Sequence, residues 1–284
     1  MRNIDQHNIT QAVIGRLTNC DNPRLREVLT SLVTHLHDFV RETRLTEKEW
    51  MQGIAFLTDT GHMCTGQRQE FILLSDTLGV SMLTVALNQA RPPGATEATV
   101  FGPFHVDDAP PVEAGADIAR GAPGEPLFVD IEVVGLDGKA IAGASVDVWQ
   151  ADEDGLYDVQ RPELGEERRA RGVLRTDAAG RTHFRTIVPT AYPVPTDGPV
   201  GRMLVASGRH PWRPAHVHFL IHASGFQTLT THIFREPDPY LDSDVVFGVR
   251  SSLIGQFERH ERGPRADTPY FTLSQRFVLA PQAA

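Results

Sequence analysis

The sequence predicts a mainly β protein with added α-helices, in which an N-terminal helical domain precedes an antiparallel β-sandwich. Two observations support this fold class. Apolar residues recur at three-four spacing through the first ninety or so residues, which is typical of helices packed along one face. Beyond that point the pattern alternates with a period of two, and glycine-rich turns separate the short apolar runs. We therefore expect a helical domain over residues 1–98 and a sandwich over residues 99–284.

The first two helices have clear start signals. A helical stripe begins after Asn22 and Pro23, where proline suits the first turn. A second helix is expected after Thr46, because Thr46 and Glu49 form a capping box, and Gly61 is its expected end. The apolar positions of the first stripe are Leu25, Val28, Leu29, Leu32, Val33, Leu36, Phe39 and Val40.

A third helix is expected over residues 67–88, before the closing pair Pro92 and Pro93. The sandwich strands follow. They are predicted at residues 127–134, 145–150, 182–188, 216–222, 228–234 and 271–279. Two long loops, residues 151–172 and 189–214, interrupt this series. Because long loops in a compact domain are usually functional or disordered, both are candidates to carry a site.

Composition and charge narrow the range of partners. The chain has 284 residues, 40% of them hydrophobic and 22% charged, as in ordinary globular proteins. A formal charge of -9 argues against nucleic acid or an anionic membrane as the partner and favours a small molecule. Cys20 and Cys64 are too few for a disulfide framework or a thiolate metal cage. No apolar run reaches the roughly 18 residues of a membrane span, and none resembles a signal peptide, so we expect a cytoplasmic protein.

One short motif places two imidazoles on the same face of a strand. In residues 213–219 (Arg-Pro-Ala-His-Val-His-Phe), His216 and His218 are two positions apart, about 7 Å along a strand. Two neutral imidazoles in this arrangement can bind one metal ion. No carboxylate follows at short spacing, since position 222 is His222 and the next acid is Glu236. The alternative is a strand that carries polar residues on one face without binding a metal.

Each long loop also contains a tyrosine. Tyr157 and Tyr192 are two of only four tyrosines in the chain. A phenol loses its proton only near pH 10, so a strongly Lewis-acidic ion such as Fe(III) is needed to hold it as a phenolate at neutral pH. The alternative is that both are half-buried loop anchors with hydrogen-bonded hydroxyl groups.

Taken together, three segments resemble the intradiol ring-cleavage dioxygenases. These are Val-Trp-Gln-Ala-Asp at 148–152 with Gly-Leu-Tyr-Asp at 155–158, Ala-Tyr-Pro-Val-Pro at 191–195, and the motif at 213–219. The resemblance implies an Fe(III) cofactor held by Tyr157, Tyr192, His216 and His218 in a catalytic β-sandwich. It also implies that the helical domain is a dimerisation linker that forms a homodimer. Relatives can hold a lipid-like molecule at such a helical interface, which stays open for this chain.

Within this family, three segments are most similar to the branch that cleaves hydroxyquinol. They are residues 100–106, 231–234 and 240–249, and His232 stands where catechol-cleaving relatives usually have Gln. The resemblance implies cleavage of hydroxyquinol (benzene-1,2,4-triol) by O2 to 3-hydroxy-cis,cis-muconate, which tautomerises to maleylacetate. Cleavage of catechol or a chlorocatechol to cis,cis-muconates is the alternative. A metal-free β-sandwich binding module is the alternative from a different class.

The same resemblance implies a substrate pocket and three catalytic residues. Arg213 would stabilise charge on the ring, Tyr192 would leave the metal and take up a substrate proton, and His232 would hydrogen-bond the substrate or a metal-bound oxygen. A loop-ordering salt bridge for Arg213 and a structural role for His232 are the alternatives. Asp76 lies in an apolar helical stripe, where the third hydroxyl of the triol could donate to it. The alternatives are that Asp76 lies at the helix surface or that it bonds a backbone amide. The implied pocket consists of Leu73, Asp76, Val100, Phe101, Gly102, Pro103, Phe104, Val194, Pro195, Arg213 and Val246.

Overall fold

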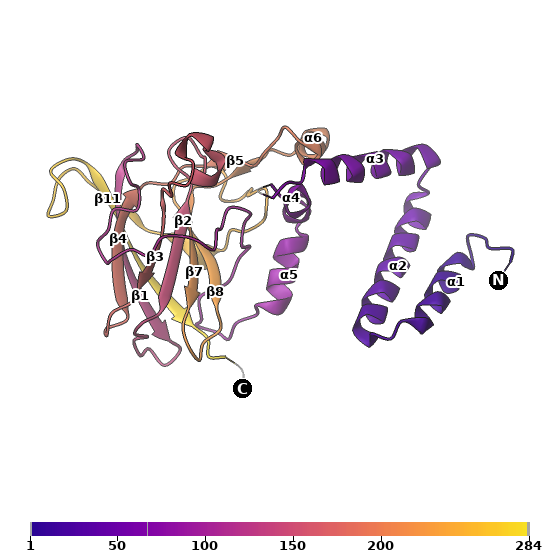
Figure 1. Ribbon diagram of the computed structural model, residues 1–284, viewed down its shortest axis with the longest axis horizontal. Helices are drawn as coiled ribbons and strands as arrows, with labels where there is room; N and C mark the ends of the chain where they lie inside the picture. Colours follow the sequence, from indigo (N-terminus) through magenta and orange to yellow (C-terminus); the bar gives the residue numbers. More distant parts are fainter. Residues whose placement is uncertain (1, 67, 283–284) are drawn as a thin grey trace. The chain divides into compact units, whose positions relative to one another are not determined.

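The structure is a computed structural model that describes residues 2–66 and 68–282 (Figure 1). The chain forms two compact units, Met1–Asp59 and Thr60–Ala284. The predicted division at residues 98 and 99 concerns functional domains and stays a prediction.

The first unit is helical, as the sequence predicted. It contains α1 (Ile9–Arg16), the short 3-10 helix η1 (Leu17–Asn19), α2 (Pro23–Thr43) and most of α3 (Glu47–Met63), which runs on into the second unit. The Asn22 side chain accepts a hydrogen bond from the Leu25 amide at 3.0 Å and caps α2. The capping box of α3 is also confirmed, since the Glu49 carboxylate accepts from the Thr46 amide at 2.9 Å. The expected end at Gly61 is wrong by two residues, because α3 continues to Met63.

The apolar stripe of α2 is exposed. None of the residues of this helix is buried; Leu29 and Val33 of the stripe are half-buried, and the other six stripe residues are between 44% and 52% exposed. They are Leu25, Val28, Leu32, Leu36, Phe39 and Val40. An apolar surface of this kind on a water-soluble helix usually marks an interaction site.

The second unit begins with a correction to the predicted third helix. Residues 70–88 form two helices, α4 (Glu70–Thr77) and α5 (Val80–Asn88), bent by 76° at the break. Gly79 causes the break, because its backbone is left-handed with φ +75° and ends the run of helical residues. The expected start at Gln67 lies outside the described residues. Among the described residues, no single helix is long and apolar enough to cross a membrane. The bent pair α4 and α5 meets these criteria of length and composition only when its two helices are counted together.

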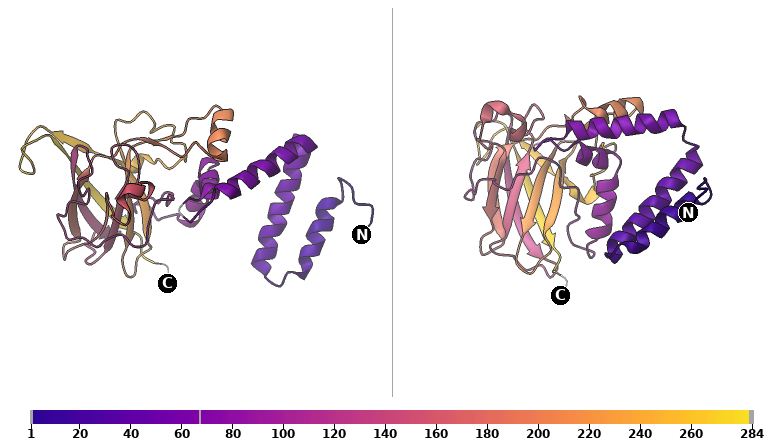
Figure 2. Two further views of the ribbon diagram at one scale, coloured as in Figure 1. Left: turned by 45° about the horizontal axis from the view of Figure 1, so that its top comes forward. Right: turned by 45° about the vertical axis from the view of Figure 1, so that its right-hand side comes forward.

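Two stacked sheets form the body of the second unit (Figure 2). One has the strand order β10-β11-β1-β4 and the other β3-β2-β7-β8-β9. The strands are β1 (Pro126–Gly135), β2 (Ser145–Gln150), β3 (Arg171–Arg175), β4 (Arg181–Ile187), β7 (His216–His222), β8 (Leu229–Arg235), β9 (Ile254–Gly255), β10 (Phe257–His260) and β11 (Tyr270–Leu279). Inward-facing side chains of both sheets fill the core, as the Phe219 and Phe277 rings do, 4.9 Å apart.

The sandwich is antiparallel except at two strand pairs. β1 pairs with β11 in parallel and β8 pairs with β9 in parallel, so both sheets are mixed. Parallel neighbours need a long connection, and residues 136–269 separate β1 from β11 along the chain. All six predicted strands are present, with ends that differ from the prediction by one residue at most.

The two predicted loops contain more regular structure than expected. The first holds the 3-10 helices η2 (Asp158–Gln160) and η3 (Pro162–Leu164) and leads into β3. The second holds the short strands β5 (Tyr192–Pro193) and β6 (Trp212–Arg213) with α6 (Pro199–Ala206) between them. Pro199 at the first helical position was an available start signal for α6. β5 pairs with β6, which brings Tyr192 opposite Arg213.

Candidate active site

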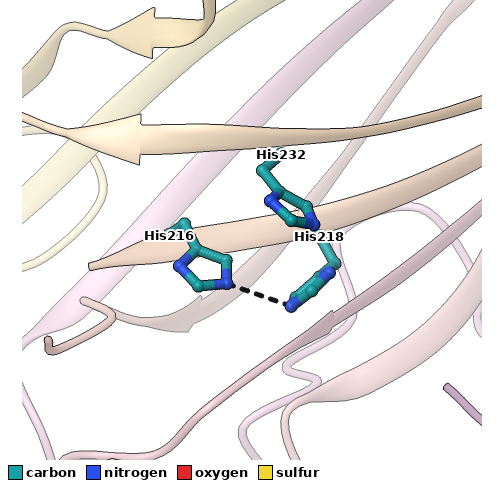
Figure 3. A group of neighbouring side chains, drawn as sticks. All are labelled: His216, His218 and His232. Carbon is teal, nitrogen blue, oxygen red and sulfur yellow. Dashed lines mark hydrogen bonds between the residues drawn. The ribbon is translucent and has the colours of Figure 1, made fainter. Parts of the chain in front are cut away.

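The two histidines of β7 lie side by side in the interior (Figure 3). His216 is 2% exposed and His218 is 1% exposed, and their Nε2 atoms are 3.1 Å apart. His216 Nδ1 donates to the carbonyl oxygen of Pro214 at 2.7 Å, because a carbonyl can only accept. The Nε2 atom of neutral His216 therefore carries a lone pair, and it lies close to both His218 Nε2 and Arg213 Nη1.

Both loop tyrosines reach this pair of imidazoles. Tyr157 Oη lies 2.8 Å from His218 Nε2 and donates to Tyr192 Oη at 3.2 Å. Both tyrosines are buried rather than half-buried. The structure thus brings together four donor atoms from β7, β5 and the loop after β2, which belong to the four residues that the resemblance named.

Two glycines allow this close approach. Gly155 has φ +78°, and a Cβ there would lie 2.7 Å from the Cβ of Tyr192. Gly102 has φ +79°, and a Cβ there would lie 3.1 Å from His218 Cε1. Any other residue would be strained at either position and would push against a donor side chain. The glycines therefore let the loop of Tyr157 and the segment of Gly102 pack directly on the site.

Aromatic neighbours fix the orientation of His218. The sheet register places Trp149 of β2 and His232 of β8 on either side of it. The Trp149 ring stacks on His218 at 4.7 Å with an interplanar angle of 15°. The His232 ring meets His218 edge-on with centroids 4.1 Å apart. His218 is therefore held between two rings, although its Nδ1 atom has no hydrogen-bond partner among the described residues.

A buried ion pair lies next to Tyr157. Asp158, the next residue, pairs with Arg171 of β3, and both side chains are 1% exposed. Arg171 also donates to the carbonyl oxygen of Phe104 at 3.0 Å, and the Phe104 ring stacks on Tyr157 at 4.5 Å. The sequence analysis missed both members of the pair. Asp158 was visible beside Tyr157 in its motif, but nothing in the sequence connected it to Arg171.

Burial controls the protonation of the donor groups. It lowers the pKa values of His216, His218 and His232 well below the ordinary value, and neighbouring positive charge lowers them further. Burial raises the pKa of Tyr157 well above its ordinary value, and Tyr192 adds to the rise. The imidazoles are therefore neutral at neutral pH, whereas the phenol gives up its proton only to a strong positive charge.

This set of donors can hold a metal ion. Ligand atoms about 2.0–2.2 Å from a metal lie about 2.8–3.6 Å from one another. The separations from Tyr157 Oη to His218 Nε2, from His218 Nε2 to His216 Nε2, and from Tyr157 Oη to Tyr192 Oη fall between 2.8 and 3.2 Å. His232 joins His216 and His218 in a second grouping, whose nitrogen atoms lie within 4.8 Å of one another.

Arg213 lies beside the same donors and is 3% exposed. Its Nη1 atom is 3.4 Å from Tyr192 Oη and 3.2 Å from His216 Nε2, while Nη2 is 3.4 Å from His232 Nδ1. Burial opposes its charge, yet the pKa of Arg213 is raised, because Asp244 and the two tyrosines favour the cation. Asp244 pairs with Arg213 Nε at 3.1 Å. The sequence analysis missed it, because Asp244 entered only as a part of the segment 240–249.

The predicted pocket residues lie around this centre in several ways. Four of them line a pocket of about 310 Å³: Leu73, Pro103, Phe104 and Pro195. Gly102 packs on His218, and the Phe101 ring lies 5.9 Å from that of Trp149, although Phe101 is 44% exposed. The backbone of Val100 hydrogen-bonds His232, and the Val246 amide donates to Asp244 at 3.4 Å. Val194 is buried, and its amide donates to the Pro211 carbonyl oxygen at 2.9 Å.

Asp76 is buried at 5% exposure on α4. Burial raises its pKa, while a hydrogen bond from Ser81 and the charge of Arg213 oppose the rise. Asp76 is therefore not at the helix surface, which was one of the two alternatives. Its carboxyl group lies near Arg213, whose charge lowers its pKa, and near Asp244, whose charge raises it.

The chain is similar to known dioxygenases over most of its length. The family described as "Dioxygenase" matches residues 100–280, and the family described as "Catechol dioxygenase N terminus" matches residues 22–96. A 6-chlorohydroxyquinol 1,2-dioxygenase from Cupriavidus pinatubonensis is 59% identical over 99% of this chain and 99% of its own. A hydroxyquinol 1,2-dioxygenase from a Rhizobium species is 48% identical over 95% of this chain and 94% of its own. The crystal structure of hydroxyquinol 1,2-dioxygenase from Pseudomonas putida DLL-E4 is 45% identical and superposes with a TM-score of 0.89, covering 98% of this chain and 99% of that one.

Proposed function

The chain belongs to the intradiol ring-cleavage dioxygenase family, and from that premise we propose that it cleaves hydroxyquinol with O2 between two adjacent hydroxyl groups. The product is 3-hydroxy-cis,cis-muconate, which tautomerises to maleylacetate. The convergence of two phenol oxygens and two imidazole nitrogens in a buried site carries this proposal. Relatives that act on hydroxyquinol or its chlorinated form support the substrate, since catechol 1,2-dioxygenases are more distant.

We propose that Fe(III) is the metal, held by Tyr157, Tyr192, His216 and His218. Burial makes the Tyr157 phenol harder to ionise, so the ion must be strongly Lewis acidic. Two phenolates and two neutral imidazoles leave a ferric centre with one net positive charge, which favours an anionic substrate. When bound, Fe(III) supplies the Lewis acidity that binds the two ortho oxygens of the substrate and prepares the ring for O2.

His232 is a poorer candidate for a metal ligand than the two tyrosines. A guanidinium can only donate, so His232 Nδ1 accepts from Arg213 Nη2 across their 3.4 Å contact. Neutral His232 then carries its proton on Nε2, and its Nδ1 lone pair accepts from Arg213, as the Nε2 lone pair of His216 also does. We propose that His232, which the Val100 backbone also hydrogen-bonds, directs its N–H toward a substrate oxygen.

Tyr192 and Arg213 divide the handling of proton and charge. Tyr192, as one of the residues that would hold the metal, would also be the base that takes up a proton from a substrate hydroxyl. Its oxygen lies 3.4 Å from Arg213 Nη1, which can donate a hydrogen bond to it. The same guanidinium stabilises negative charge on the ring as the catecholate shifts toward a ketonic form.

Asp76 is proposed to select hydroxyquinol over catechol. A buried carboxyl group that accepts from the third hydroxyl loses that partner when catechol binds, which costs about 10- to 100-fold in discrimination. We expect Asp76→Leu to lower kcat/KM for hydroxyquinol by about this factor and to leave catechol turnover within about threefold. Catechol turnover of the same variant is the internal control. Equal losses on both substrates would reject the selective role of Asp76.

A direct test of the function compares wild-type protein loaded with Fe(III) on both substrates under air. We expect faster cleavage of hydroxyquinol than of catechol, with maleylacetate as the product. A clear preference for catechol would favour the alternative catechol or chlorocatechol activity. A protein that stays colourless after reconstitution with iron would instead support a metal-free binding module.

We further propose a homodimer through the N-terminal helices, because the apolar stripe of α2 is exposed along its length. A cytoplasmic location is proposed on the basis of Cys20 and Cys64, which are both free. Whether a lipid lies between the helices is tested by mass spectrometry of an organic extract of the purified protein.

A further inference from the structure

We propose that Asp244 is a positioning residue that holds the Arg213 guanidinium in the orientation the reaction needs. The inference rests on the proposed function, because it assigns a role toward the same site. Asp244 lies outside the expected ligand set and the expected pocket. Among the described residues, its carboxylate hydrogen-bonds Arg213 and two backbone amides and none of the four donor atoms, so it acts through Arg213.

The ion pair with Asp244 uses the Nε and Nη2 atoms of the guanidinium and leaves Nη1 for other partners. Asp244 Oδ1 accepts from Arg213 Nε at 3.1 Å, and Oδ2 accepts from Nη2 at 3.4 Å. The remaining Nη1 atom is directed at Tyr192 Oη and His216 Nε2. A two-point contact fixes the plane of a guanidinium, whereas a single contact leaves it free to rotate.

The carboxylate is itself held rigidly. Its oxygens accept from the Gly248 amide at 2.9 Å and from the Val246 amide at 3.4 Å. The Phe247 amide closes the turn by donating to the Asp244 carbonyl at 2.9 Å. A Cβ at Gly248 would lie 3.1 Å from Asp244 Oδ2 and 3.2 Å from Arg213 Nη2, so the turn packs directly on the pair. The backbone thus fixes Asp244, and Asp244 fixes Arg213.

Without Asp244 the guanidinium would have a second carboxyl group to turn to. Arg213 stays charged at all pH values of interest, and its side chain is only 4% exposed, so it needs a partner. Asp76 is already within reach of its charge. Rotation toward Asp76 would move Nη1 away from Tyr192 and His216 and would occupy the carboxyl group proposed to bind the third hydroxyl.

The test is a double-mutant cycle on iron-loaded protein, with kcat and KM for hydroxyquinol. Asp244→Asn keeps the shape of the side chain and removes its charge. We expect it to lower kcat by about 10- to 100-fold with a smaller change in KM. In an Arg213→Ala background we expect the same substitution to change kcat by less than about threefold, because the residue through which it acts is gone. An equal loss in both backgrounds would overturn the inference.

A second variant perturbs the pair without removing a charge. Gly248→Ala introduces the crowding Cβ and should lower kcat several-fold, whereas Gly53→Ala, which has nothing within 4 Å of its added Cβ, should not. If Gly248→Ala left kcat at the wild-type value, the turn would have no part in positioning Arg213. This variant keeps the inference testable if Asp244→Asn does not fold.

A third measurement does not depend on turnover. In metal-free protein labelled with 15N-arginine, the Arg213 Nε–H should exchange with solvent at least about tenfold faster in Asp244→Asn than in wild type. Unchanged exchange would contradict the inference even if activity fell. If wild-type protein failed to cleave hydroxyquinol, the proposed function would fail, and this exchange measurement would still decide whether Asp244 holds Arg213.

Discussion

Mild acid should destabilise the metal-free protein through its three buried histidines. His216, His218 and His232 are each at most 2% exposed, and burial lowers the pKa of each well below its ordinary value of about 6.5. Below pH 6.5 these histidines therefore bind protons in the unfolded chain that they do not bind in the folded chain. The stability that these groups contribute is fully present above pH 6.5 and is lost as the pH falls toward their folded pKa values.

The size of this effect follows from the number of histidines. Each one that stays neutral in the folded state contributes a loss of about 1.4 kcal/mol between pH 7.5 and 5.5. The three together contribute up to about 4 kcal/mol over that interval. The value approaches this limit because the rings are neighbours, with centroids 4.1 to 4.8 Å apart, so protonating one disfavours protonating the others.

Urea unfolding of the metal-free protein at pH 7.5, 6.5 and 5.5 measures the loss. His232→Gln should reduce it by about 1.4 kcal/mol, because one of the three groups is removed. His222→Gln is the control, since His222 lies at the exposed end of β7 whereas His232 is buried on β8, and it should reduce the loss less than His232→Gln does. Identical pH dependence in the two variants, or a total loss below about 1 kcal/mol, would refute the argument.

Three further predictions concern the site and the helices. Tyr157→Phe should abolish turnover and bleach or shift the visible band of the iron-loaded protein. It should also destabilise the metal-free protein by about 1–2 kcal/mol, because a hydrogen bond is lost. An unchanged spectrum would contradict the ligand role. Gly155→Ala should lower the free energy of urea unfolding by about 2–4 kcal/mol, because the added Cβ meets Tyr192. Gly143→Ala, which adds only the strain of a left-handed backbone, should lower it by about 1 kcal/mol. Equal losses would contradict the packing argument. Phe39→Glu should convert the dimer to a monomer in sedimentation analysis, and an unchanged mass would argue against an interface through α2.

Local patterns predicted the strand and the helix starts well. The strand that carries His216 and His218 was predicted residue for residue, because side-chain alternation along a strand is set by neighbouring positions alone. The capping signals of α2 and α3 were equally local. Grouping the two tyrosines with the histidines needed the family resemblance, since nothing in the spacing of distant loops fixes how they fold back.

The features that were missed depend on contacts between distant segments. The pairing of Arg171 with Asp158 and of Arg213 with Asp244 joins residues on separate segments, and no sequence pattern marks such partners. The parallel pairing of β1 and β11 likewise depends on how the whole sandwich closes. The break at Gly79 was different in kind, because a glycine inside an apolar stripe is tolerated in many helices and gives only a weak stop signal.

The visible absorption spectrum of the iron-loaded protein tests the central claim most directly. A ferric ion held by Tyr157 and Tyr192 should give a broad phenolate-to-metal band that changes when hydroxyquinol is added without O2. Admitting O2 should then return the original band as the ring-cleaved dicarboxylate forms. A colourless iron-loaded protein, or a band that hydroxyquinol leaves unchanged, would contradict the proposed site.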